Sequence, residues 1–286
     1  MSSVRAGTLY LVSTPIGNLG DMTHRAVEVL SSAALVIAED TRHSRRLLDH
    51  YKISTPLKSY HEHNEAQETP RLVARLRAGD SVALISDAGT PLISDPGSRL
   101  VVAALEANLP VVPIPGASAF LCGLAASGLP TDSFRFNGFL PAKSGQRRQA
   151  LEGIQVSSRT QVFYEAPHRL KQAVGDIVEV LGTERPIVIA REITKIHEEF
   201  LRGSAGEIEQ TLNARGDIKG EITLLVGKAE ETKQEMSRAT IGERLRQVLS
   251  EEKLDEKAAL KRVAKELGIS KSQAYRELQR LKLSRN

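Results

Sequence analysis

The 286-residue chain has few cysteines and few aromatic residues, and each shortage excludes something. Cys122 is the only cysteine, so no internal disulfide can form, and no Cys/His spacing resembles a zinc site. This usage is typical of a reducing compartment, so we expect a cytoplasmic protein. Tryptophan is absent and aromatic residues make up 4% of the chain, so the composition does not indicate a sheet that stacks single-stranded RNA.

The sequence also lacks a hydrophobic run suited to a membrane. The longest uncharged stretch, residues 107–131, is long enough to cross a bilayer but contains four prolines and three glycines. Prolines at that density break helices, so we expect a strand, a loop and a buried helix there. Near the N-terminus the apolar run is only residues 9–12, too short for a signal peptide. We therefore expect no membrane association.

The positive charge is concentrated at the C-terminal end. Residues 257–286 contain nine Lys or Arg and two Glu, a net charge of +7, whereas the whole chain has +4. Residues 1–256 are therefore slightly acidic. A basic tail of this kind can contact nucleic acid or form a solvated helical face, and composition alone leaves both open.

Short apolar runs alternate with helical patterns along the first part of the chain. We expect strands at residues 8–13, 34–38, 81–86 and 109–114, separated by helices at 21–30, 42–50, 64–78 and 97–107. Asp21 or Thr23 is expected to cap the first helix. This alternation predicts an α/β domain over residues 1–114, with a mainly parallel sheet covered on both faces.

A second α/β domain is expected over residues 115–228. Its predicted strands are residues 134–138, 160–164, 186–191 and 221–226, and its predicted helices are residues 118–127, 147–155, 168–181 and 204–212. Residues 229–240 are polar and predict a linker. Residues 241–286 predict a helical tail, in which Gly268 and Ser270 would separate two helices with helix-turn-helix spacing.

Two loops rich in Gly, Pro, Asp and Ser follow predicted strands, at residues 86–97 and 113–118. In open parallel sheets, ligands bind beyond the carboxyl ends of the strands. Asp87 can accept hydrogen bonds from ribose hydroxyls or an amine, and Gly89 lets the backbone approach a ligand closely. Asp95, which precedes a proline, is expected to cap the next helix. The second loop is expected to form one wall of a binding site.

Other candidate features are less specific. His61 and His63 are two residues apart and lack a third ligand, so we expect no metal site. Cys122 lies in an apolar helix and is expected to be a small core residue. Basic residues crowd two loops, which makes a phosphate-rich partner plausible: Arg42, Arg45 and Arg46 in one, and Lys143, Arg147 and Arg148 in the other.

Eight segments, taken in order, resemble the tetrapyrrole methylase family. They are residues 14–21, 38–43, 86–97, 115–118, 138–141 (Gly-Phe-Leu-Pro), 163–169, 191–195 and 219–221. The resemblance spans about residues 8–227. Residues 15–18 depart from the glycine-rich first loop of the tetrapyrrole enzymes, which disfavours a porphyrin-like substrate and fits the RNA-modifying branch of the family.

The resemblance implies a fold, an activity and partners. It implies two α/β domains with S-adenosylmethionine in the cleft between them, a helical C-terminal extension and a homodimer. The implied reaction is 2′-O-methylation of a cytidine ribose in the decoding centre of small-subunit rRNA, free or in the assembled subunit. No metal is implied.

The resemblance also assigns residues. Those matching the cofactor-binding segments are Asp87, Ala88, Gly89, Ile93, Ser118, Tyr164, Arg191 and Gly220. A free 2′-hydroxyl is a weak nucleophile, so a nearby base would help. Candidates for that base are Glu165, Glu192 and Glu221, although each can instead form a structural ion pair with Arg169 or Lys195. Candidates for binding RNA phosphates are Arg42, Lys143, Arg147 and Arg148.

Two alternatives remain open from sequence. The chain can be a small-molecule tetrapyrrole methyltransferase, which the altered first loop and the basic tail disfavour. It can also be a DNA-binding regulator that uses the C-terminal helix pair, with the α/β part sensing a ligand. The second alternative leaves the matched loop motifs unexplained.

Overall fold

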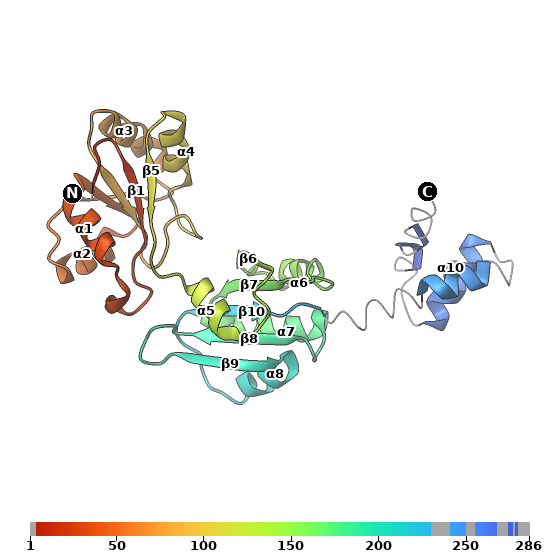
Figure 1. The fold of residues 1–286 in the computed structure, drawn as a ribbon. Coiled ribbons are helices and arrows are strands. Elements are labelled where there is room, and N and C mark those ends of the chain that lie inside the picture. Colours follow the sequence, from red (N-terminus) through yellow and green to blue (C-terminus); the bar gives the residue numbers. More distant parts are fainter. Residues whose placement is uncertain (1–3, 230–240, 250–254, 268–273, 277, 280–286) are drawn as a thin grey trace. The chain divides into compact units, whose positions relative to one another are not determined.

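The computed structural model describes residues 4–229, 241–249, 255–267, 274–276 and 278–279. It contains two compact units, one formed by residues 1–155 and 159–227 and the other by residues 156–158 and 228–286. The first unit contains two five-stranded sheets (Figure 1). We call residues 4–114 the first lobe and residues 115–227 the second lobe.

The first lobe is built on a parallel sheet of strand order β3-β2-β4-β1-β5. The strands are β1 (Leu9–Val12), β2 (Leu35–Ala38), β3 (Leu57–Ser59), β4 (Val82–Ile85) and β5 (Val111–Ile114). The helices are α1 (His24–Ser32), α2 (Thr41–His50), α3 (Glu65–Arg77) and α4 (Ser98–Glu106), with a 3-10 turn η1 (Leu19–Asp21). β2 and β4 are buried along their whole length, as continuous apolar runs predict.

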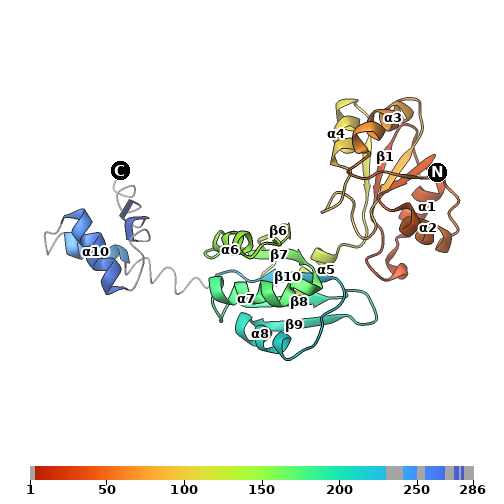
Figure 2. The same cartoon turned by 180° about the vertical axis from the view of Figure 1, so that it is seen from behind.

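Helices cover both faces of this sheet, with α1 and α2 on one side and α3 and α4 on the other (Figure 1 and, from behind, Figure 2). Two apolar clusters fill the two interfaces, one including Val29 and Leu48 and the other including Leu72 and Leu100. The predicted parallel sheet is therefore confirmed. Thr23 caps α1, since its side chain accepts from the Ala26 amide.

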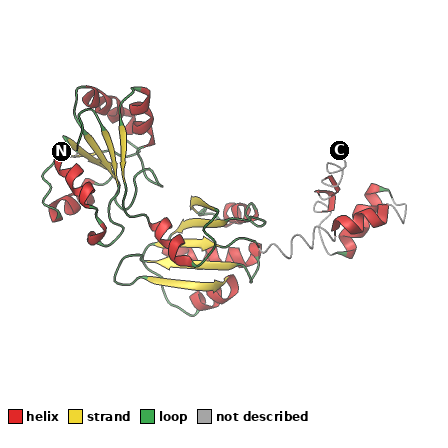
Figure 3. Cartoon of the chain, in the orientation of Figure 1, coloured by secondary structure: helices red, strands yellow, loops and turns green. Residues whose placement is uncertain are grey.

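The second lobe contains a mixed sheet, whose strands are yellow in Figure 3. Its strand order is β6-β7-β10-β8-β9. The strands are β6 (Phe134–Phe139), β7 (Thr160–Glu165), β8 (Pro186–Arg191), β9 (Glu199–Ser204) and β10 (Ile222–Val226). The helices are α5 (Ala119–Ser127), α6 (Ser144–Glu152), α7 (Leu170–Leu181) and α8 (Ala205–Asn213), with a 3-10 turn η2 (Pro167–Arg169). Only β6 and β7 are parallel, and β10 and β9 run antiparallel to their neighbours.

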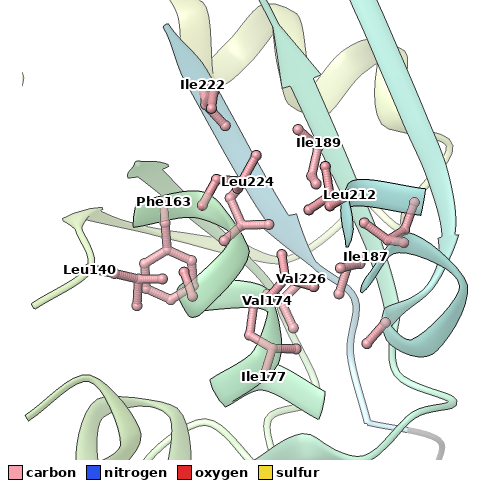
Figure 4. Close-up of a cluster of buried hydrophobic side chains, with 14 of the residues drawn as sticks. Leu140, Phe163, Val174, Ile177, Ile187, Ile189, Leu212, Ile222, Leu224 and Val226 are labelled. Carbon is pink, nitrogen blue, oxygen red and sulfur yellow. The ribbon is translucent and has the colours of Figure 1, made fainter. Parts of the chain in front are cut away.

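The main core of the second lobe packs α7 and α8 against one face of this sheet. Its side chains include Phe163, Val174, Ile189, Leu212 and Leu224 (Figure 4). On the other face α5 buries Leu124 but leaves Cys122 exposed. The expectation that Cys122 is a core residue is therefore wrong, because the apolar helix turns only one side toward the sheet.

The second unit contains a helix at residues 241–249 and α10 (Glu256–Glu266), which is capped by Asp255. Leu245, Val248 and Val263 share a small apolar core, and Arg244 donates to Glu266 at 2.8 Å. The turn predicted at Gly268 and Ser270, and residues 230–240 of the predicted linker, lie outside the described residues. None of the described helices combines the length and the apolar character needed to cross a bilayer.

Candidate active site

A cavity of about 420 Å³ lies within the first unit, at the carboxyl ends of first-lobe strands. The segments that line it follow β1 and β4, begin α5, end β6 and β7, and flank the start of β10. The lining residues are Ile16, Asp87, Ala88, Gly89, Thr90, Ile93, Ser94, Asp95, Ser118, Ala119, Phe139, Tyr164, Glu165, Ala166, Pro167, Ile193, Gly220, Glu221, Ile222 and Thr223. Its position is the one that open α/β sheets offer to ligands.

Backbone hydrogen bonds fix the first-lobe wall. Thr14 and Gly89 form a two-way bridge, with N···O distances of 2.8 and 3.1 Å. The Thr14 hydroxyl also donates to the Ser86 carbonyl at 3.1 Å. These bonds tie the loop after β4 to the loop after β1, so the cavity-facing backbone of residues 87–89 is held in place.

Gly89 is required in this wall for two reasons. Its φ is +81°, a conformation that side-chain-bearing residues rarely adopt. A Cβ there would lie 3.3 Å from Ile16 Cγ2 and 3.6 Å from the Ala117 carbonyl. The absent side chain therefore leaves room for the packing of three loops, and it keeps the backbone accessible from the cavity.

Asp95 lies in this wall and not at the start of a helix. α4 is capped by Gly97, and no side-chain cap bond is present among the described residues, so the expected cap at Asp95 is wrong. Burial raises the pKa of Asp95 to about 6, and the nearby carboxylates of Glu39 and Asp87 add to the shift. Burial and Asp87 likewise raise the pKa of Glu39. Crowded carboxylates of this kind favour a positively charged ligand group.

Side chains build the second-lobe wall. The Tyr164 ring contacts Phe136 and Phe139 edge-on, at centroid distances of 5.0 and 5.6 Å. Burial raises the pKa of the Tyr164 hydroxyl, so it stays protonated near neutral pH. Phe139 is 56% exposed although it lines the cavity.

Glu165 is the most buried of the three candidate bases. Its side chain is 0% exposed, and Oε1 lies 2.7 Å from both Arg169 Nη2 and the Ala166 amide. Oε2 is buried and accepts no hydrogen bond from any described residue. Arg169 Nε is likewise buried without an acceptor among the described residues, and buried polar atoms left unsatisfied are costly.

The other two candidates differ from Glu165. Glu192 Oε1 accepts from Lys195 Nζ at 2.7 Å and from the Glu221 amide at 2.9 Å, and the bond from Lys195 lowers its pKa. A Cβ at Gly220 would lie 2.5 Å from Glu192, so this carboxylate packs against the loop before β10. Glu221 lines the cavity, but its side chain is 72% exposed and pairs with Lys195 at 3.1 Å. Glu192 therefore forms the ion pair with Lys195 that the sequence left open.

Seven of the eight predicted cofactor residues line the cavity: Asp87, Ala88, Gly89, Ile93, Ser118, Tyr164 and Gly220. Arg191 is not among the described residues that line it. Arg191 instead donates to Glu199 at 3.1 Å and to the Lys219 carbonyl at 3.2 Å. It thereby holds the segment that precedes Gly220.

The basic candidates fall into two kinds. Arg42 is 90% exposed and forms a salt bridge with its neighbour Asp40, while Lys143 is exposed at the start of α6. Arg148 is partly exposed and pairs with Asp176 at 2.7 Å. Arg147 is only 2% exposed and pairs with Asp176 at 2.6 Å. The expectation that Arg147 binds RNA phosphate is corrected here, because a buried and paired guanidinium is out of reach of RNA.

Sequence analysis missed several lining residues. Asp95 belongs to the loop at residues 86–97, which is expected to bind a ligand. Its carboxylate is the feature in the sequence that could have indicated a place in the cavity wall. Phe139 belongs to the Gly-Phe-Leu-Pro segment, which was recognised but given no role. Ile193 belongs to the segment 191–195, which carries the family resemblance but has no assigned role. Thr223 lies within β10 and carries no signal in the sequence, since hydroxyl side chains in strands are common. Within the described residues, no group of three or more His, Cys, Asp or Glu is placed to hold a metal.

The cavity can be compared with known proteins. The profile of the tetrapyrrole (corrin/porphyrin) methylases matches residues 8–209, which include all but the first four described residues of the first lobe and most of the second. The chain belongs to this family. Tetrapyrrole methylases are S-adenosylmethionine-dependent methyltransferases.

Two relatives of this methylase are each named ribosomal RNA small subunit methyltransferase I. The protein of Synechocystis sp. is 46% identical over 273 residues, covering 94% of this chain and 96% of the relative. That of Mesorhizobium japonicum is 49% identical over 274 residues, covering 96% and 92%. Uroporphyrin-III C-methyltransferase from Thermus thermophilus, solved with S-adenosylhomocysteine, has a TM-score of 0.53 at 19% identity, covering 77% of this chain and 97% of that one. This likeness shows a shared fold.

Proposed function

We propose that this methylase transfers a methyl group from S-adenosylmethionine to the 2′-hydroxyl of a cytidine in the decoding centre of small-subunit rRNA. The names and high identity of the relatives support rRNA as the substrate. The observation that carries the chemistry is Glu165, a buried carboxylate among the residues that line the cavity, whose Oε2 accepts no hydrogen bond within the described part of the chain.

The cavity fits the methyl donor. Its volume of about 420 Å³ is within the range of sites for small molecules and cofactors. Gly89 offers close backbone contact, and Asp87 and Asp95 place negative charge near a ligand that carries positive charge. The bound donor supplies a methyl group already activated on a sulfonium sulfur. The protein therefore needs to orient the acceptor oxygen and receive its proton.

Glu165 is the group we assign to that proton. Oε1 is occupied by Arg169 and the Ala166 amide, so the carboxylate is fixed in orientation while Oε2 is left to accept from the 2′-hydroxyl. Glu165 would receive the hydroxyl proton when the methyl group's bond to sulfur breaks and its bond to the ribose oxygen forms, with S-adenosylhomocysteine as the leaving group. General-base assistance of this kind typically contributes about 10²–10⁴-fold to the rate.

We assign Arg42, Lys143 and Arg148 to RNA phosphates, with the basic tail as a further contact. Their exposure and the charge of the tail support this assignment. Neutralising all three should weaken RNA binding and make its dependence on salt shallower by about three phosphate contacts, with cofactor binding unchanged. An unchanged salt slope would exclude them as phosphate contacts. We also propose a cytoplasmic homodimer without a metal, on the family resemblance.

The decisive experiment maps the product. The purified protein is incubated with methyl-labelled S-adenosylmethionine and small ribosomal subunits from a strain that lacks this gene. Label on one cytidine that resists alkaline cleavage on its 3′ side would establish 2′-O-methylation. Free rRNA in parallel distinguishes the two forms of the substrate. Label on neither, with S-adenosylhomocysteine binding intact, would refute the proposal and favour a small-molecule acceptor.

A further inference from the structure

A chain with few aromatic residues gathers five of them in one place. Four of its six phenylalanines, together with Tyr164, form a connected cluster on α5, β6 and β7. The members are Phe120, Phe134, Phe136, Phe139 and Tyr164, with centroid distances between 4.6 and 6.4 Å. The cluster runs from the α5 side of the sheet to the cavity, where Phe139 and Tyr164 are lining residues.

Phe139 is held at the cavity in an exposed position. The β6–β7 register shifts between Phe136 and Phe139, and Gly138 has a φ of +68°, so the strand bulges just before the ring. The next residue, Leu140, is 2% exposed and anchors the chain in the second-lobe core. Buried Arg147 donates to the Ala142 carbonyl at 3.1 Å, which fixes the following turn.

An exposed aromatic ring on so rigid a support is suited to stacking. Leaving a large apolar side chain in water forfeits hydrophobic free energy, and the surrounding anchors prevent it from folding inward. Enzymes that modify nucleotides within RNA or DNA commonly turn the target base out and stack it on aromatic side chains. The Gly-Phe-Leu-Pro segment has no other role in the proposed chemistry.

We propose that Phe139 stacks on the nucleobase of the nucleotide to be methylated. Phe139 pairs in register with Tyr164, the neighbour of Glu165 on β7. Phe139 and Glu165 both line the cavity, so a nucleotide whose 2′-hydroxyl meets Glu165 there has its base in the same cavity as the Phe139 ring. This inference rests on the proposed RNA substrate, and it names the second-lobe group that positions that substrate.

The test uses three variants and two measurements. Phe139→Leu keeps apolar volume but removes the ring, Phe139→Tyr keeps the ring, and Phe134→Leu is the matched control. Phe134 belongs to the same strand and cluster, is 38% exposed and lies outside the cavity-lining set of described residues. We measure methylation kinetics on small subunits from the strain lacking this gene, and S-adenosylhomocysteine affinity by calorimetry.

We expect Phe139→Leu to lower kcat/KM for the subunit about 5- to 150-fold, the usual effect of losing one base stack. Phe139→Tyr and Phe134→Leu should remain near wild type, and cofactor affinity should not change in any variant. An unchanged kcat/KM for Phe139→Leu would overturn the inference. So would a loss of S-adenosylhomocysteine affinity of equal size, which would place the ring against the cofactor's adenine. If the wild-type protein labels no RNA, the proposed function fails first.

Discussion

The two walls of the cavity are built by different means. Backbone hydrogen bonds and glycines fix the first-lobe wall, as in the bridge between Thr14 and Gly89. Side-chain contacts fix the second-lobe wall, as in the pair of Glu165 with Arg169 and the ring contact of Tyr164 with Phe139. A wall fixed by backbone hydrogen bonds suits a ligand that needs to be bound but not deprotonated. Oriented side chains suit the acceptor, from which a proton must be taken.

The carboxylates of the two lobes also differ. Asp95 lines the cavity, and Glu39 acts on it electrostatically. Both lie near other carboxylates and are partly desolvated, so their pKa values are raised. In the second lobe, Lys195 lowers the pKa of Glu192, and Arg215 lowers that of Glu199. Carboxylates thus lie close to one another on the first-lobe side, whereas Glu192 and Glu199 of the second lobe are paired with cations. This arrangement attracts a cation to the first-lobe wall.

The largest expected effect tests the second-lobe wall. Glu165→Gln should lower kcat by about 10²–10⁴-fold, because the amide cannot accept the hydroxyl proton. Affinity for S-adenosylhomocysteine should change little, since the first-lobe wall is intact. The control is Glu221→Gln, whose exposed side chain should leave kcat near wild type. Near-normal turnover by Glu165→Gln on small subunits would remove Glu165 as the base.

A second effect concerns the stability of the second lobe. Arg147→Met should lower the free energy of unfolding by about 3 kcal/mol, because Asp176 would lose its most buried partner. Arg148→Met should cost about 1 kcal/mol or less, since that guanidinium is 42% exposed. Denaturant titration of both variants gives the comparison. Equal losses in the free energy of unfolding would show that Arg147 and Arg148 stabilise Asp176 to the same extent.

Arg147 and Arg148 also illustrate a property that the sequence does not predict, which is the burial of one of two adjacent arginines. The fold was predictable because apolar runs such as those of β2 and β10 mark central strands, and helices fall between them. Adjacent arginines carry the same signal in sequence, whereas burial depends on how α6 turns against α7. That packing pairs Arg147 with Asp176, 29 residues away. β3 and β9 escaped prediction because short or polar strands at sheet edges lack an apolar run.

The site was predictable to a similar degree. Loops that follow strands were expected to bind a ligand, and Asp87 and Gly89 do line the cavity. Asp95 was misinterpreted because an Asp-Pro pair is a common helix start, whereas here the helix begins at Ser98. Which of Glu165 and Glu192 is the better candidate for the base can be judged only from the three-dimensional structure. It depends on which carboxylate lines the cavity and which one pairs with Lys195, and sequence does not contain that information.

A smaller effect tests the first-lobe wall, where the backbone of residues 87–89 faces the cavity. Gly89→Ala should weaken S-adenosylhomocysteine binding about tenfold or more, because a Cβ strains the φ of +81° and crowds Ile16. Gly79→Ala is the matched control. Its φ is +99°, but no described atom lies within 4 Å of the added Cβ. Both variants should lose about 1–2 kcal/mol of stability, and only Gly89→Ala should lose affinity in calorimetry. Equal affinities would show that the ligand does not depend on this wall.

The smallest effect concerns the stability of the protein at two pH values, because the pKa of Asp95 is raised and that of Glu192 is lowered. The unfolded chain releases the Asp95 proton near pH 4, whereas the folded protein keeps it to about pH 6. Asp95 therefore costs stability progressively as pH rises through that interval. Asp95→Asn should stabilise the ligand-free protein by about 1–2 kcal/mol at pH 7.5 and hardly at all at pH 4, after allowance for partial solvent screening.

Glu192 should respond with the opposite sign. Its lowered pKa means that the pair with Lys195 stabilises the fold above the unfolded pKa, and that this contribution fades as pH falls. Glu192→Gln should therefore destabilise at pH 7.5 and less so at pH 4. Thermal unfolding of both variants at the two pH values measures the pair of effects. If Asp95→Asn stabilised the protein equally at both pH values, the pKa of Asp95 in the folded protein would not be raised.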